Sequence, residues 1–167
     1  MTPSKVYLVA HVDSELSARL QSLEREIFPD RASRTETTGI AWHLTLATLE
    51  GEITEETINH LRTLATKTKP LRLDFSHMGL FGPDILFIAP TMSQALFELR
   101  QEVCRIIETC EADWVPHVTL VYRRPESIAQ AISVISQALP LGGQIESLSL
   151  YHFPPSERIV HFELGEV

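Results

Sequence analysis

Apolar and polar residues alternate along the chain with two different periods, and these periods predict a series of strands and helices. Period-two alternation and short apolar runs predict strands at residues 5–12, 41–49, 71–81, 84–90, 115–123, 144–153 and 157–164. Apolar positions three or four residues apart predict amphipathic helices at residues 14–28, 53–67, 92–110 and 125–139. The polar stretch 29–39 is predicted to be a loop.

The predicted elements occur twice in the same order, which indicates an internal duplication. The strands at 41–49 and 115–123 are each preceded by a strand and a helix, and each is followed by a helix and a strand hairpin. Both strands carry the sequence His-x-Thr-Leu, and their histidines, His43 and His117, lie 74 residues apart. Most other side chains differ between the halves, so something other than strand formation retains these positions.

The order of elements predicts an α+β fold. We expect a bilobal, duplicated fold with a pseudo-two-fold axis, in which two antiparallel sheets line a central cleft and the helices pack outside. Residues 1–167 are expected to form a single domain of two interleaved lobes, with the repeat covering roughly 1–80 and 81–167. A chain of this length can bury a sizeable core.

The two histidine motifs direct their polar side chains to one face of each strand. In a strand, residues i and i+2 point to the same side, so His43 projects together with Thr45, and His117 with Thr119. The apolar neighbours point to the opposite side and are expected to pack under the helices. A pseudo-two-fold relation then brings the two His/Thr pairs to opposite walls of one cleft.

Two opposed imidazoles suit an in-line displacement at phosphorus, in which the attacking and leaving oxygens lie on opposite sides. A neutral histidine accepts a proton from the nucleophile and a protonated one donates to the leaving group, and a pKa of about 6.5 makes both forms accessible. The threonine hydroxyls donate hydrogen bonds to the non-bridging oxygens. This chemistry needs neither a metal ion nor a cofactor, and we expect none.

The stretches HLTL (43–46) and HVTL (117–120) resemble the paired H-x-T-φ motifs, with φ apolar, of the two-histidine (2H) phosphoesterase superfamily. This superfamily includes the bacterial RNA 2',3'-cyclic phosphodiesterases, also called 2'-5' RNA ligases, and the eukaryotic cyclic nucleotide phosphodiesterases. The resemblance extends over essentially the whole chain. It implies that His43 and His117 are the catalytic acid/base pair and that Thr45 and Thr119 bind the substrate phosphate.

The residues after the second motif depart from the pattern of many bacterial members, which have an arginine directly after a short apolar continuation. Here the continuation is VY, which is more similar to the plant-type cyclic phosphodiesterases, and Arg123 and Arg124 follow it. By strand alternation Arg123 shares the face of His117. We therefore expect Arg123 to be a further phosphate-binding residue.

The formal net charge of -8 limits the partners. A protein that binds long nucleic acid neutralises several phosphates with lysine and arginine, so we expect a small nucleotide or short oligonucleotide as substrate. No apolar run approaches the roughly 20 residues that span a bilayer, and the N-terminus lacks the apolar core of a signal peptide. We expect a cytoplasmic monomer that does not associate with membranes.

Cysteines and the remaining histidines suggest no other site. Cys104 and Cys110 fall in the helix predicted at 92–110, where a separation of six residues points them in different directions, so no disulfide is expected. A zinc site is disfavoured because no third or fourth ligand is evident near both motif strands. His11, near the end of the first strand, could approach the cleft, but a surface position is the better expectation.

The sequence thus predicts a metal-independent phosphodiesterase. The expected reaction is hydrolysis of a 2',3'-cyclic phosphate, or of a related cyclic or 2',5' phosphodiester, of a nucleotide or short RNA end to a phosphomonoester. Two alternatives stay open: a non-catalytic nucleotide- or RNA-end-binding module, and a 2'-5' RNA ligase that runs the same chemistry in reverse. The repeat makes the two histidines equivalent, so their acid and base roles stay open as well.

Overall fold

The computed structural model describes residues 5–108 and 110–165. The strands are β1 (Lys5–Val12), β2 (His43–Leu49), β3 (Leu71–Phe81), β4 (Ile85–Pro90), β5 (Val118–Tyr122), β6 (Leu141–Phe153) and β7 (Glu157–Glu163). The helices are α1 (Ser14–Ile27), α2 (Arg34–Thr38), α3 (Glu55–Lys67), α4 (Gln94–Ile106) and α5 (Ile128–Ala138), with a 3-10 turn over Pro125–Ser127 before α5. The α+β prediction is confirmed, and the expected loop 29–39 contains α2.

The strands pair in antiparallel fashion in the order β2-β1-β6-β3-β4-β5, and β7 also pairs with β6. The two expected sheets are the two halves of one continuous sheet. They are joined where residues 71–75 of β3 pair with residues 141–145 of β6. As a result β2 and β5, which carry the histidine motifs, lie at opposite ends of the strand order.

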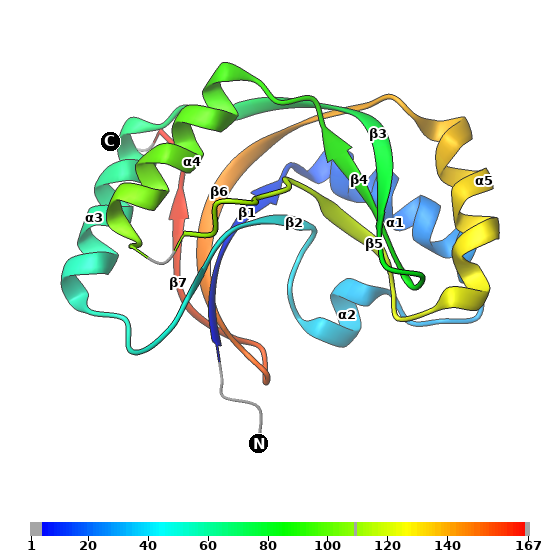
Figure 1. The fold of residues 1–167 in the computed structure, drawn as a ribbon, viewed down its shortest axis with the longest axis horizontal. Helices are drawn as coiled ribbons and strands as arrows, with labels where there is room; N and C mark the ends of the chain where they lie inside the picture. The colour runs from blue at the N-terminus through cyan, green and yellow to red at the C-terminus, as the bar shows by residue number, and fades with distance from the viewer. Residues whose placement is uncertain (1–4, 109, 166–167) are drawn as a thin grey trace.

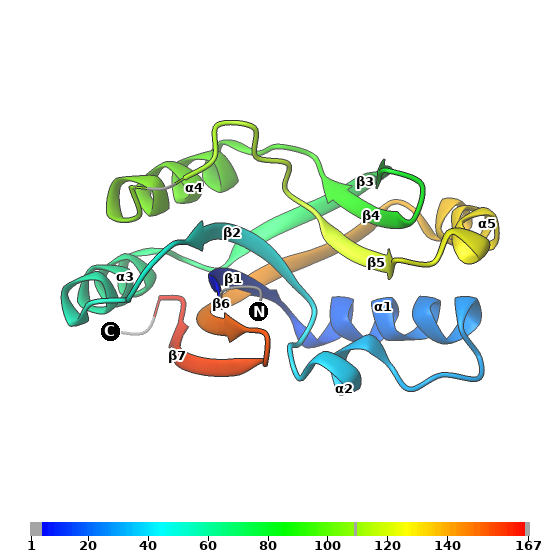
Figure 2. The same ribbon diagram turned by 60° about the horizontal axis from the view of Figure 1, so that its bottom comes forward.

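Two pairs of helices flank the sheet at its two ends (Figure 1). Helices α3 and α4 contact each other and pack against β7 and β2, whereas α1 and α5 contact each other and pack against β6 and β4. Figure 2 shows the two helix pairs on either side of the strands, with α2 beside the entry to β2. Helix α1 from the start of the chain thus packs with α5 from near its end.

Local sequence signals explain where the helices begin. Asp13, Thr54 and Ser93 cap α1, α3 and α4 by accepting hydrogen bonds from backbone N–H groups of the first turn, and each satisfies a donor that the helix leaves unpaired. Pro125 opens the turn before α5. In the part of the chain that the structure describes, the helices lack the length and apolar character needed to cross a bilayer.

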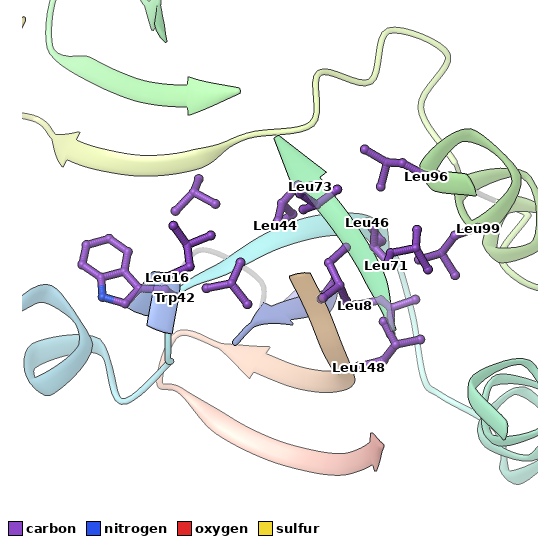
Figure 3. Packing of buried hydrophobic residues seen from close by; sticks show 14 of the residues in the cluster. Leu8, Leu16, Trp42, Leu44, Leu46, Leu71, Leu73, Leu96, Leu99 and Leu148 are labelled. Atoms are coloured by element: carbon purple, nitrogen blue, oxygen red, sulfur yellow. The ribbon is translucent and has the colours of Figure 1, made fainter. Parts of the chain in front are cut away.

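The hydrophobic core lies between the sheet and the helices and runs continuously through both lobes. Figure 3 shows part of it, and Leu44 and Leu46 of β2 belong to the same cluster as Leu71 and Leu73 of β3. Leu44 and Leu46 are fully buried, and burial of each such side chain stabilises the fold by roughly 1.5–3 kcal/mol. Because side chains alternate along a strand, this burial fixes the intervening residues on the opposite, polar face.

Candidate active site

The two histidine motifs meet in one small pocket. His43 and Thr45 come from β2, His117 comes directly before β5, and Thr119 comes from β5. All four line a pocket of about 80 Å³. The structure therefore brings together the four residues that the two motifs predict.

Both histidines are held by the same backbone contact. The Nδ1–H of His43 donates to the carbonyl oxygen of Ala41 at 2.7 Å, and the Nδ1–H of His117 donates to the carbonyl oxygen of Val115 at 2.7 Å. Because a carbonyl oxygen only accepts, the proton of each neutral ring is on Nδ1, which leaves Nε2 for proton transfer. The duplication thus extends to the groups that set the tautomer.

Burial lowers the pKa of both histidines. Burial lowers the pKa of His43 from 6.5 to about 4. The hydrogen bond to Ala41 raises this pKa and so opposes the effect, whereas the charges of Arg34 and His117 lower it further. Burial also lowers the pKa of His117, with its backbone hydrogen bond opposing and the charge of Arg34 adding to the effect. At neutral pH both imidazoles of the unliganded site are therefore neutral.

Arg34, the first residue of α2, is a site residue that the sequence reasoning missed. It lines the pocket, and its Nη1 donates to the carbonyl oxygen of Thr119 at 2.5 Å. A capping box between Ser33 and Glu36 begins α2, and the backbone N–H of Arg34 donates to Oε1 of Glu24 at 2.7 Å. The available signal was the S-x-x-E capping pattern at residues 33–36.

Trp114 makes the matching contact on the other motif. Its Nε1–H donates to the carbonyl oxygen of Thr45 at 2.9 Å. Each motif threonine carbonyl thus accepts a hydrogen bond from the segment that precedes the other motif, from Arg34 in one case and from Trp114 in the other. The guanidinium of Arg100 lies over the indole, 5.1 Å from the ring centroid, and donates to the carbonyl oxygen of Glu111 at 2.9 Å.

A disulfide between Cys104 and Cys110 holds the start of the segment that carries Trp114. The expectation of no disulfide is wrong because α4 ends at Ile106 and not at residue 110. The chain then turns back and brings the two cysteine Cα atoms to 5.4 Å. The apolar pattern hides this end, since Ile107 beyond the helix is a buried core residue.

His11 lies beside His43, with 6.4 Å between ring centroids. It is 8% exposed, so the expected surface location is wrong: β1 is an inner strand, covered by β2 and β6. The Nε2 atom of His11 is 3.0 Å from Oγ of Ser149, and this Oγ is 2.8 Å from Nδ1 of His161. The Nε2 atom of His161 is in turn 2.8 Å from Oε1 of Glu163. A hydrogen-bonded chain therefore connects an exposed carboxylate with the surroundings of His43.

His117 has aromatic neighbours instead. Its ring centroid is 4.9 Å from that of Phe81 and 5.1 Å from that of Phe87. The Phe87 ring lies over Gly79, where an added Cβ would be only 2.5 Å from Cζ of Phe87. The glycine therefore creates the space in which the ring packs against His117.

Arg123 does not line the pocket. The pairing of β5 with β4 shifts register between Thr119 and Val121, so Leu120 and Val121 are both buried and the side-chain alternation changes phase. The argument from alternation therefore fails beyond this bulge. Arg123 follows the strand with a φ of 54°, is exposed, and places its guanidinium 5.2 Å from the ring centroid of Tyr122.

Two further histidines lie outside the pocket. His60 on α3 and His77 on β3 are exposed and do not line the pocket. Within residues 5–108 and 110–165, no group of three His, Cys, Asp or Glu side chains is arranged to hold a metal ion.

Solved structures of low sequence identity share this fold. TT0787 of Thermus thermophilus gives a TM-score of 0.65 at 17% identity, over 97% of this chain and 98% of its own. LigT of E. coli, in a complex with NADP+, gives 0.65 at 18% identity, over 99% and 100% of the two chains. Usb1 of Kluyveromyces marxianus gives 0.52 at 13% identity, over 96% and 98%. The search of curated protein sequences gave no match.

The fold and the paired histidines define a protein of the two-histidine phosphoesterase class. The family model of the 2'-5' RNA ligase superfamily matches residues 5–154, most of the chain. The chain belongs to the 2'-5' RNA ligase superfamily, whose members act on phosphodiester bonds. The resemblance inferred from the H-x-T motifs is thereby confirmed.

Proposed function

We propose that this protein is a phosphodiesterase that hydrolyses a 2',3'-cyclic phosphate, or a related cyclic or 2',5' phosphodiester, of a nucleotide or short RNA end. The observation that carries the proposal is the pair of imidazoles in one pocket, each with its Nδ1–H bound to a backbone carbonyl. The superfamily supports it, and so do the structures of E. coli LigT complexed with 3'-AMP and with ATP.

In the proposed reaction a water molecule attacks phosphorus in line with one ribose oxygen. Nε2 of a neutral histidine accepts the proton of the water, and Nε2–H of a protonated histidine donates to the ribose oxygen as its bond to phosphorus breaks. We assign the base to His43, because its pKa of about 4 is low enough to keep it neutral even when a bound anion raises the pKa of the pocket histidines. His117 is then the acid.

The charge of the substrate prepares the acid. In the unliganded site Arg34 lowers the pKa of both histidines. A phosphodiester anion next to Arg34 offsets that charge, raises the pKa of His117 and promotes uptake of a proton on binding. The hydroxyls of Thr45 and Thr119 and the guanidinium of Arg34 donate to the non-bridging oxygens, where charge develops. No step in this scheme requires a metal ion.

The test is turnover of a panel of nucleoside 2',3'-cyclic phosphates and 2'-5' dinucleotides in the presence of EDTA. We expect hydrolysis of at least one substrate, and a loss of at least about 10³-fold in kcat/KM in both His43→Ala and His117→Ala, since each removes one proton-transfer group. His60→Ala is the matched control, because this histidine is exposed on α3, and it should retain full activity.

Activity that survives either pocket substitution contradicts the mechanism, and activity that EDTA abolishes contradicts its metal independence. Nucleotide binding without turnover favours a binding module. Formation of 2'-5' bonds in preference to their hydrolysis favours a ligase.

A further inference from the structure

On the side of Arg34 the catalytic pocket adjoins a larger pocket of about 330 Å³, and Arg34 and Thr38 line both. Four arginines line this second pocket, which we call the arginine pocket: Arg25, Arg31, Arg34 and Arg124. The whole chain has 14 lysines and arginines against 22 acidic residues. Four arginines around one pocket therefore create a local positive region on an acidic protein, and such a region attracts anions.

Three of these guanidinium groups are weakly engaged. Arg25 and Arg31 are exposed, and Arg31 lies 5.5 Å from the ring centroid of Phe28. Arg124 is 3.8 Å from Glu126 in a solvent-exposed ion pair, which contributes little energy. Guanidinium groups match the geometry of phosphate oxygens and bind them through paired N–H donors. The arginine pocket thus has the chemistry of a phosphate site.

A buried carboxyl group gives the pocket a second polar feature. Glu24 lines it and is 6% exposed. Its Oε1 accepts from the backbone N–H of Arg34, whereas Oε2 has no hydrogen-bond partner among the described residues. A buried oxygen without a partner is costly, so a ligand with a hydroxyl or amino group satisfies it. Phosphate together with a hydroxyl or amino donor is the chemistry of a nucleotide.

The pocket on the other side of the histidines has a different character. It measures about 350 Å³, shares Thr45 and His117 with the catalytic pocket, and is also lined by Trp114 and by the exposed acidic residues Glu111 and Asp113. Arg100 also lines it, but the guanidinium of this arginine already donates hydrogen bonds to Cys110 and to the carbonyl oxygen of Glu111. A second phosphate is therefore favoured on the arginine side and disfavoured on the acidic side.

We propose that the arginine pocket binds a second phosphate, on the 5' side of the nucleoside whose 2',3' phosphate occupies the catalytic pocket. The assignment of that first phosphate rests on the proposed function. The substrate class is then a nucleotide with a phosphate at its 5' position, either a terminal 5'-monophosphate or the internal phosphodiester of a short oligonucleotide. Nucleosides with only a cyclic phosphate are the poorer substrates.

The test is calorimetric binding of product analogues, which does not depend on turnover. We expect adenosine 3',5'-bisphosphate to bind at least about tenfold more tightly than 3'-AMP at low salt, and added salt to reduce the difference. The double substitution Arg25→Gln/Arg31→Gln should remove this difference and leave the affinity for 3'-AMP within about twofold. The control Arg19→Gln/Arg72→Gln removes the same charge outside the pocket and should retain the difference.

Equal affinities of the two ligands for the wild-type protein overturn the proposal. So does a difference that survives Arg25→Gln/Arg31→Gln, or one that the control substitutions remove equally. A third ligand, ApA 3'-phosphate, separates the two sources: tighter binding of this dinucleotide as well supports recognition of an internal phosphate, and tighter binding of the bisphosphate alone supports recognition of a terminal one. If the difference is found but no cyclic phosphate is hydrolysed, the proposed reaction fails and the second phosphate site stands.

Discussion

The half of the site built on His43 and the half built on His117 share their reactive groups and differ in what surrounds them. Both have a threonine two residues on and a backbone carbonyl on Nδ1. Beside His43 lies a hydrogen-bonded polar chain that begins at the buried His11, whereas His117 lies against two phenylalanine rings. The comparison indicates that the two halves retain the same histidine, threonine and backbone contact and differ in the groups that surround each histidine.

The contacts between the halves diverged in the same way. The carbonyl of Thr119 accepts from a cationic guanidinium, and the carbonyl of Thr45 accepts from a neutral indole. The hydrogen bond to the threonine carbonyl therefore comes from a charged group, Arg34, in one half and from an uncharged aromatic ring, Trp114, in the other. This difference adds to the asymmetry of the pocket and places its positive charge at Arg34.

The largest expected effect separates the acid from the base. With thymidine 3'-(p-nitrophenyl phosphate), the leaving p-nitrophenolate needs no proton, so His117→Ala should keep activity within about tenfold of wild type, whereas His43→Ala should lose about 10³-fold. Release of p-nitrophenolate measures both. The opposite pattern reverses the assignment of roles, and equal losses show that both groups are needed for a reason other than proton transfer.

Substitution of Arg34 tests the positive end of the cleft. Arg34→Gln should lower kcat/KM by about 10²- to 10³-fold, because it removes a donor to the developing charge. It should also move the acid limb of the pH–rate profile to higher pH, since Arg34 lowers the pKa of both histidines and its removal raises them. Arg34→Lys retains the charge and should leave the limb in place. An unshifted limb in both variants contradicts the electrostatic role.

The buried His11 beside His43 should make the free energy of unfolding depend on pH. Burial, with the charges of His43, His161 and Arg158, lowers the pKa of His11 from 6.5 to about 4. Between these values the unfolded chain binds a proton that the folded chain does not, so stability falls as the pH falls from 6.5 to 4. The contribution of His11 is about 3 kcal/mol between pH 7 and pH 4.

Urea unfolding of His11→Asn at both pH values measures this contribution. The variant should lose less stability on acidification than wild type, whatever its stability at pH 7. An unchanged pH dependence contradicts the assignment to His11. His77→Asn, at an exposed position, is the control and should behave as wild type.

The disulfide at the start of the segment that carries Trp114 should contribute less to the free energy of unfolding. Cys104→Ser/Cys110→Ser opens a short loop, and the chain-entropy estimate for such a loop is a loss of about 2 kcal/mol. Denaturant unfolding with and without a reductant measures it: the reductant should destabilise wild type and leave the double variant unchanged. A reductant effect of equal size in both proteins shows that the disulfide is not its source.

The smallest effect is expected outside the pocket. Arg123→Ala should change kcat/KM by less than about twofold, because the side chain is exposed and lies over Tyr122 rather than in the pocket. A loss of tenfold or more restores Arg123 as a phosphate ligand and requires the loop after β5 to move on binding.

The sequence predicts the strands of the motifs and their four polar residues because those features are local. Alternation along β2 and β5 and the distance between repeats determine which side chains share a face. Arg34 escapes this reasoning because α2 is too short to show an apolar period, and only its capping box reveals it.

The remaining errors arise where the structure depends on distant pairing. A bulge against β4 reverses the alternation before Arg123 is reached. The buried position of His11 follows from the place of β1 between two other strands, which no local pattern encodes. The disulfide depends on where α4 ends, and apolar residues on both sides of that end continue the helical pattern.

The ladder between residues 71–75 and 141–145 has a mechanical consequence. Both motif strands belong to one continuous sheet, and the pairing of β3 with β6 joins the half that contains β2 to the half that contains β5. Gly143 lies in this ladder opposite Leu73, and a Cβ there would come within 2.5 Å of Leu16 on α1. The seam that joins the two halves of the sheet carries none of the four motif residues, yet a side chain at position 143 would require Leu16 and α1 to shift away from it.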